Sequence, residues 1–110
     1  MQILNDVNPV QASVNANTLV ANGTLDATAA LSVSFTIENS GAQSIDYEIV
    51  AGNLEDLSDA TVVQASATLT SGSFGTYAVS IAPYSYYGIM IASTVGGAHG
   101  EATIRGRAKG

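Results

Sequence analysis

The 110-residue sequence has no cysteine and no tryptophan, and its only prolines are Pro9 and Pro83. Without cysteine, neither a disulfide framework nor a thiolate site can form. Charged residues make up only 11 % of the chain, and the formal net charge of −6 argues against a surface that binds nucleic-acid phosphates. No apolar run approaches the ~20 residues of a membrane span, and the start, MQILNDVNPV, lacks the segments of a signal peptide. We therefore expect a soluble chain that binds neither nucleic acid nor a membrane.

The residues that are present indicate one β-rich domain. A chain of 110 residues can bury a core of its own but leaves no room for a second one. Its large apolar residues are dispersed among Ser, Thr, Gly and Asn, which is typical of strands and turns. All the cations lie in the last six residues, and all nine carboxylates precede them; the cations are Arg105, Arg107 and Lys109. This separation of charge along the chain either orients the protein on a charged partner or only keeps it soluble.

Alternation of apolar and polar residues predicts strands along most of the chain. The clearest case is the segment 31–38, in which every second residue is a large apolar one. Further alternating segments are 44–49, 61–69, 77–81, 85–94 and 100–108. Among the residues that we expect to point inward are Leu31, Phe35, Ile81, Ala102, Ile104, Gly106 and Ala108.

The N-terminal part has different signals. Residues 1–17 are rich in asparagine around Pro9, which favours an extended, irregular arm over a packed element. Asn22 and Gly23 stand between short apolar runs, and this pair predicts a two-residue hairpin turn. We therefore expect an arm over 1–17 and a β-sandwich domain over 18–110.

The expected fold class is all-β, as a two-sheet antiparallel sandwich of about seven strands. No stretch has sustained helical periodicity, and turn signals recur every eight to twelve residues. An up-and-down barrel is the alternative.

One run resembles a known signature. The spacing Ile81-x-Pro83-x-x-x-Tyr87-x-Ile89-x-Ile91 resembles that of fibronectin type III and related immunoglobulin-like sandwiches. The resemblance implies an immunoglobulin-like architecture in which Tyr87 forms a structural tyrosine corner. Its ring would lie in the core, its hydroxyl would bond to backbone a few residues upstream, and Pro83 would begin the turn between the sheets. The tryptophan that this family usually buries is absent here.

The other tyrosines of the run indicate a contact surface. If 85–94 pairs with 100–108, one outward face would bring aromatic, thioether and guanidinium groups together, and these types are enriched at interface centres. The candidate partner-binding residues are Tyr84, Tyr86, Met90, Arg105 and Arg107. The alternative is that the arginines merely stack on Tyr86 within one chain.

We expect no catalytic, cofactor or metal site, and hence no enzyme. His99, the only histidine, lies in a glycine-rich loop without the parts of a triad or a zinc site. The acidic segment 52–60 has too few carboxylates for a typical calcium cage, although calcium stays an alternative. Asp46 and Glu48 have the spacing of neighbours on one strand face but are more typical of solvated charges than of a glycosidase pair.

The second half of the chain, from Tyr47 onward, resembles the small β-sandwich structural proteins of tailed bacteriophages, particularly those that decorate or cement the capsid. The resemblance lies in short Ser/Thr/Ala strands, the pair Tyr86 and Tyr87, and a glycine- and histidine-bearing loop. It implies a virion structural protein that is assembled in the host cytoplasm and located on the capsid surface. The implied partner is the major capsid protein or another virion protein, bound non-covalently in many copies, and a homo-oligomer is possible.

Two other functions stay open at this point. One is a carbohydrate-binding or adhesive module, for example on a phage tail or fibre, in which Tyr84 and Tyr86 would stack on sugar rings. The other is a fibronectin-like spacer.

Overall fold

The computed structural model describes residues 3–14, 20–28, 31–94 and 100–109, with side chains from Thr24 onward. These residues form eight strands. The strands are β1 (Ile3–Val14), β2 (Val20–Asp26), β3 (Ser32–Asn39), β4 (Ile45–Gly52), β5 (Thr61–Leu69), β6 (Phe74–Val79), β7 (Tyr86–Ser93) and β8 (Gly100–Lys109). The described part of the chain contains no helix that could cross a membrane.

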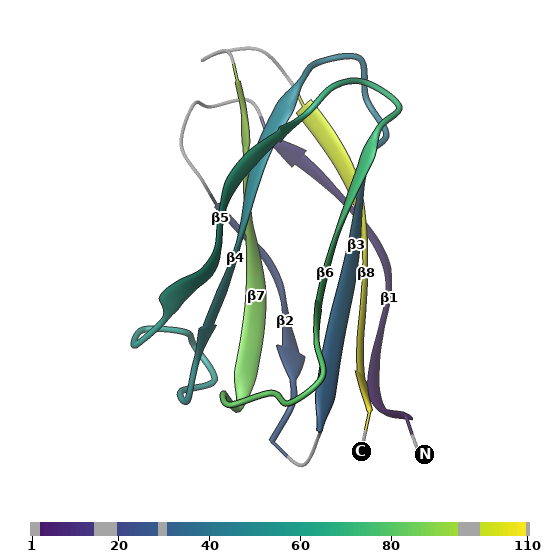
Figure 1. Cartoon of the computed structure of the whole chain (residues 1–110). Coiled ribbons are helices and arrows are strands. Elements are labelled where there is room, and N and C mark those ends of the chain that lie inside the picture. The colour runs from purple at the N-terminus through teal and green to yellow at the C-terminus, as the bar shows by residue number, and fades with distance from the viewer. Residues whose placement is uncertain (1–2, 15–19, 29–30, 95–99, 110) are drawn as a thin grey trace.

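The strands form two antiparallel sheets that face each other (Figure 1). One sheet has the order β1-β8-β3-β6 and the other has the order β2-β7-β4-β5. We call them the β8 sheet and the β7 sheet. The expected all-β, two-sheet sandwich is therefore confirmed, with eight strands where the sequence indicated about seven, and the barrel alternative is wrong.

The connectivity is that of a jelly roll. The first four strands pair with the last four in reverse order, as β1 with β8, β2 with β7, β3 with β6, and β4 with β5. Such a chain is a long folded hairpin rolled into two sheets, and only β4 and β5 are consecutive strands of the same sheet. Immunoglobulin sandwiches instead keep several consecutive strands together in one sheet. The expected immunoglobulin-like connectivity is therefore wrong.

Two expectations for the N-terminal part are also wrong. The segment predicted as an irregular arm contains β1, which pairs with β8 from Ile3 opposite Lys109 to Val14 opposite Gly100. The predicted hairpin turn lies inside β2, where the register shifts between Ala21 and Thr24. Because β2 has one extra residue here, this is a β-bulge. Glycine is common in β-bulges as well as in hairpin turns, so the pair Asn22 and Gly23 fits either.

The core lies between the sheets and follows the predicted alternation. The fully buried large side chains come from five strands and include Leu25, Val33, Ile37, Ile45, Ile49, Tyr87, Ile89, Ile91 and Ile104. Burying each such aliphatic side chain stabilises the fold by about 1.5–3 kcal/mol. Leu31 and Ile81, predicted to be inward, are 53 % and 72 % exposed because β3 begins after Leu31 and β6 ends before Ile81.

Gly106 permits an aromatic ring to pack against the backbone of β8. A Cβ atom at Gly106 would lie 2.8 Å from Cε1 of Phe35, which is closer than real Cβ contacts allow. The prediction that Gly106 is inward is thus confirmed, and the reason for glycine is the close approach of Phe35.

Asn39, at the end of β3, is a buried polar residue that the sequence did not single out. Its side-chain nitrogen donates to the backbone carbonyls of Gln43 (2.9 Å) and Leu69 (3.0 Å). Its side-chain oxygen accepts from the N–H of Gly41 at 3.1 Å. Because Leu69 ends β5, this one amide links the two sheets and also closes the turn between β3 and β4.

Replacing Asn39 tests this link. Asn39→Ala leaves three backbone groups without their partner, so we expect the free energy of unfolding to fall by at least about 2 kcal/mol in urea denaturation. Asn39→Asp keeps the acceptor for Gly41 but loses both donors, and it should also destabilise. The exposed neighbour Ser40→Ala is the control and should change the value by less than about 0.5 kcal/mol. An Asn39→Ala variant as stable as that control would contradict the proposed link.

Candidate interaction surfaces

The outer face of the β8 sheet carries every cation of the chain. Along β8 the inward residues are buried, and the residues that alternate with them point outward. These outward residues are Glu101, Thr103, Arg105, Arg107 and Lys109. On the neighbouring strand β3, Ser34 lies opposite Arg107 and Thr36 lies opposite Arg105. We call this outer surface the cationic face. Among the residues whose side chains are described, its carboxylates are Glu38 and Glu101, toward the end of the sheet away from Lys109, and on β1 Asp6 lies opposite Arg107 in the register.

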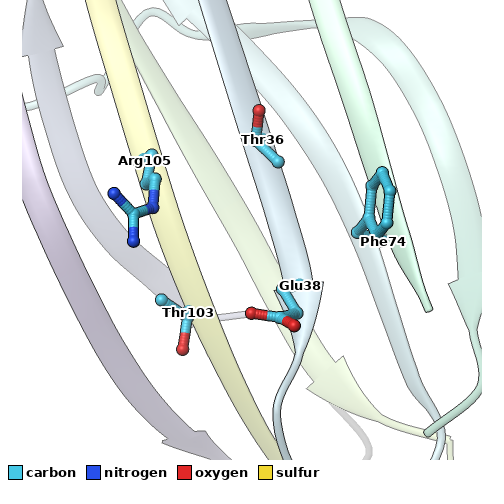
Figure 2. Close-up of a pocket in the computed structure, with 5 residues that line it drawn as sticks. All are labelled: Thr36, Glu38, Phe74, Thr103 and Arg105. Carbon is cyan, nitrogen blue, oxygen red and sulfur yellow. The ribbon is translucent and has the colours of Figure 1, made fainter. Parts of the chain in front are cut away.

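A groove of about 220 Å³ crosses this face. It is lined by Thr36, Glu38, Phe74, Thr103 and Arg105. Figure 2 shows the ring of Phe74 on β6 on one side of β3 and the guanidinium of Arg105 on β8 on the other. Phe74 is 66 % exposed, so an apolar ring and a fixed positive charge are both offered to a partner here. Phe74 lies before the segment 77–81 whose alternation predicted a strand, so the sequence analysis did not place it on this face.

The outer face of the β7 sheet has the opposite charge. Its outward residues include the carboxylates Asp26, Asp46 and Glu48. Hydrogen bonds from the side chain and then the backbone of Thr28 hold the pKa of Asp26 below its ordinary value, so this group is ionised at neutral pH. The hydroxyl of Thr68 donates to Asp46 on the same face. We call this surface the acidic face.

The predicted contact residues do not share one surface. β7 pairs with β2 and β4, and not with β8, so Tyr86 and Met90 lie on the acidic face. Arg105 and Arg107 lie on the cationic face, on the other side of the sandwich. The expected pairing of 85–94 with 100–108 is therefore wrong, and so is the alternative that the arginines cover Tyr86. A role of either group in partner binding stays a prediction.

Tyr84, Tyr77 and Tyr87 form an aromatic cluster at one end of the core. The Tyr84 ring meets the Tyr87 ring edge-on at 6.2 Å and 78°, and the Tyr77 ring lies 6.4 Å from it. Tyr84 is partly buried against the core. This packing leaves Tyr84 a poor platform for stacking on a sugar ring.

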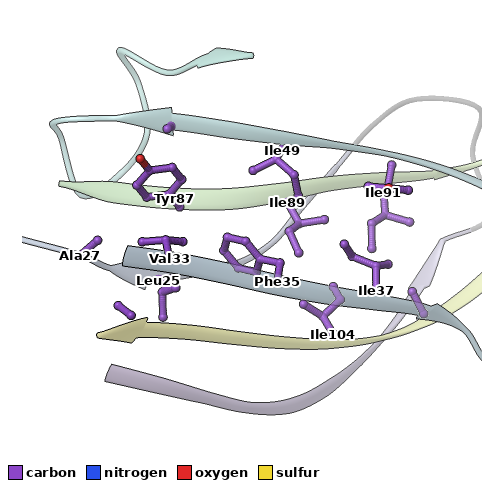
Figure 3. Close-up of a cluster of buried hydrophobic side chains, with 14 of the residues drawn as sticks. Leu25, Ala27, Val33, Phe35, Ile37, Ile49, Tyr87, Ile89, Ile91 and Ile104 are labelled. Carbon is purple, nitrogen blue, oxygen red and sulfur yellow. The ribbon is translucent and has the colours of Figure 1, made fainter. Parts of the chain in front are cut away.

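Tyr87 occupies the position that the tyrosine corner implies, and its hydroxyl lies near the backbone of Tyr84, three residues upstream, without forming a hydrogen bond of good geometry. The residue is fully buried, and Figure 3 shows its ring among the side chains of the core. Pro83 lies in the connection that takes the chain from β6 in one sheet to β7 in the other. Within the described residues, the Tyr87 hydroxyl has no hydrogen-bond partner. Burial raises the pKa of Tyr87, and the nearby backbone of Tyr84 opposes this rise in part.

Tyr87→Phe tests the state of this hydroxyl. Removing a buried hydroxyl that has no partner costs little, so we expect the free energy of unfolding to stay within about 0.5 kcal/mol of the wild type or to increase. Tyr87→Ala, the control for the ring, should lose about 3–5 kcal/mol. A loss of about 1–3 kcal/mol in Tyr87→Phe would show instead that the hydroxyl is bonded as the corner implies.

The same cluster predicts a loss of stability in alkali. Burial, and secondarily the charge of Tyr84, raises the pKa of Tyr77 above the ordinary 10.0, and burial also raises that of Tyr87. Above pH 10 the unfolded chain therefore releases protons that the folded chain retains, and the free energy of unfolding falls as pH rises. Denaturant titrations between pH 8 and about pH 11 should show this decline, which starts near the unfolded pKa. The double variant Tyr77→Phe, Tyr87→Phe should flatten it, and an equally steep decline in that variant would contradict the assignment.

The carboxylates of the loop 52–60 are used within the loop. Asp59 accepts from the backbone N–H groups of Asn53 (2.9 Å) and Leu54 (3.2 Å), and Asp56 accepts from that of Ser58 (2.9 Å). The bond from Ser58 also lowers the pKa of Asp56. Among the described residues, no three His, Cys, Asp or Glu side chains gather as they would around a metal ion. His99 lies outside the described residues.

Comparison with known proteins shows a shared fold and no shared sequence family. No family model matches the chain, and no curated protein has a matching sequence. PirA has a TM-score of 0.61 at 16 % identity, over 89 % of this chain and 92 % of its own. The PBSX exported protein XepA has a TM-score of 0.63 at 13 % identity, over 98 % of this chain but only 36 % of its own. The SPBc2 prophage-derived protein YomS has a TM-score of 0.54 at 10 % identity, over 93 % of this chain and 95 % of its own.

Proposed function

We propose that this chain is a structural protein of a bacteriophage particle, which decorates or cements the capsid by non-covalent attachment in many copies. The prophage-derived protein YomS shares its fold over nearly the whole of both chains, and this supports a phage origin. The resemblance of the second half of the chain to phage decoration proteins points in the same direction. Fold likeness at such low identity carries no function by itself, so the proposal rests on the surface of the molecule.

The observation that carries the proposal is the division of charge between the outer faces of the two sheets. The three cations lie together on the cationic face, although the chain has a net charge of −6. The acidic face has Asp26, Asp46 and Glu48, and no lysine or arginine of the chain lies on its strands. A sandwich with this polarity has one preferred orientation on a charged surface.

The cationic face is the face that we assign to the shell. It combines three positive charges with the exposed Phe74, so contact with an acidic, partly apolar protein surface would use both. The acidic face would then point to solvent, where its charge keeps decorated particles apart. Each contact of this kind is weak, but a shell presents many identical sites, and binding to the assembled state stabilises that state.

Charge variants test the assignment on purified particles. Arg105→Gln with Arg107→Gln removes two cations and changes the net charge from −6 to −8. We expect the copy number per particle, measured by quantitative mass spectrometry, to fall steeply. We also expect wild-type occupancy to fall as salt rises, because salt screens exposed charges.

The matched control has the same net charge with the change on the other face. Thr24→Asp with Ser66→Asp adds two carboxylates to the β7 sheet, both at exposed positions, and should leave occupancy unchanged. Thermal unfolding of both free variants checks that each is folded. Equal occupancy of the two double variants would contradict the role of the cationic face. Absence of the wild-type chain from particles would contradict the proposed function itself.

A further inference from the structure

The four edge strands of the sandwich differ in how they are protected against pairing with another chain. An edge strand presents unpaired N–H and C=O groups, which charge, proline and bulges normally block. The sequence of β1 includes Asp6 and Pro9, and the pairing of β1, β2 and β5 with their neighbours is interrupted by register shifts. β6 has no charged residue and no proline, and it pairs with β3 in unbroken register from Phe74 to Val79. The edge of β6 is thus the unprotected one.

This edge belongs to a long uncharged part of the chain. Between Asp59 and Glu101 the sequence has no Asp, Glu, Lys or Arg, and this interval includes β5, β6 and the connection between them. Three of the exposed large apolar residues lie in it, namely Val62, Phe74 and Ile81. This interval has no charged side chain that could pair with those of a strongly charged partner. For a chain of net charge −6, it is the side on which two copies approach each other with the least repulsion.

The backbone of β6 offers its free groups at alternate residues. The N–H of Asn39, the last residue of β3, donates to the carbonyl of Ser73 at 2.9 Å, and this pair continues the register of β3 with β6. Odd-numbered residues of β3 therefore direct their backbone toward β6. Because the register pairs odd with odd, residues 75, 77 and 79 of β6 bond to β3. The N–H and C=O groups of Phe74, Thr76 and Ala78 point away from the sheet.

We propose that two copies of this chain associate by antiparallel pairing of β6 with β6 about a twofold axis at Thr76. In this register the free groups of Thr76 meet those of Thr76 of the partner subunit, and those of Phe74 meet those of Ala78 of the partner subunit. Every free backbone group from 74 to 78 then has a partner. The two β8 sheets become one continuous sheet across the axis, and the interface is isologous.

The side chains of β6 are complementary in this register. On the outer face the large, exposed Phe74 lies opposite the small Ala78 of the partner subunit. On the inner face Gly75 lies opposite Tyr77 of the partner subunit. Large residues therefore meet small ones on both faces, and only Thr76 meets its own kind. Cross-strand pairs of this sort stabilise a sheet.

The pairing places both cationic faces on the same side of the continuous sheet, because residues that are directly opposite in antiparallel strands point to the same face. A dimer would thus offer six cations on one surface, twice the three of a single chain. The association itself does not depend on the proposed function and holds whatever the chain binds.

Single-cysteine variants test the register in a chain that has no cysteine of its own. Hydrogen-bonded antiparallel pairs have Cα atoms about 5.5 Å apart, within the range of a disulfide. We expect Thr76→Cys to form a covalent dimer rapidly on mild oxidation, seen on a non-reducing gel. Ser66→Cys, exposed on the edge strand β5, is the control and should stay monomeric. Phe74→Cys and Ala78→Cys should cross-link when mixed, but neither should cross-link alone.

Sedimentation equilibrium tests the association without a cross-link. We expect the wild type to reach twice the chain mass of 11.1 kDa as concentration rises. Thr76→Lys places two like charges on the axis and should remain monomeric, with the melting temperature that the wild type has at dilutions where it too is monomeric. Ser66→Lys should still dimerise. A wild type that is monomeric at every concentration would overturn the proposal. So would an oligomer that Thr76→Lys leaves intact, or cross-linking of Ser66→Cys as fast as that of Thr76→Cys.

Discussion

The structure depends on hydrophobic packing between two sheets whose neighbouring strands come from opposite halves of the chain. β1 and β8 are the first and last strands, yet they pair over almost their full length. Because β3 and β8 bury every second side chain, and β4 and β7 bury more than half of theirs, both sheets need their partner to cover the inner face. Within the β8 sheet the ring of Phe35 packs over Gly106 of the neighbouring strand, and the buried amide of Asn39 links the two sheets.

This winding decides which residues meet on the surface. Consecutive strands mostly lie in different sheets, so β7 and β8 lie on opposite sides of the core and their outward side chains point to opposite faces of the sandwich. The cations of β8 are thereby separated from Tyr86 and from the carboxylates of β4. The result is a molecule with a cationic face, an acidic face and an uncharged edge at β6, and each of these surfaces suits a different kind of contact.

The period of two was enough to predict the fold class and most of the core, because burial of alternate side chains is a local property of a strand. Leu31 and Ile81 were misplaced since each lies just beyond a strand end, and strand ends depend on pairing. The pairing of strands was not predictable from local pattern. The alternation within 85–94 and 100–108 is the same whether the two strands pair as a hairpin or lie in different sheets. The predicted shared surface of Tyr86, Met90, Arg105 and Arg107 was therefore wrong. Asn39 gave no signal, because a buried asparagine and a turn asparagine look alike in sequence.

Nuclear Overhauser contacts between backbone protons test the winding most directly. If β7 lies between β2 and β4, the labelled protein should show cross-strand contacts of Ala92 with Asp46 and of Tyr87 with Leu25, in the register of the β7 sheet. β8 should show its own contacts with β1 and β3. Contacts that run along β7 and β8 as direct neighbours would contradict the jelly roll and, with it, the separation of the two charged faces.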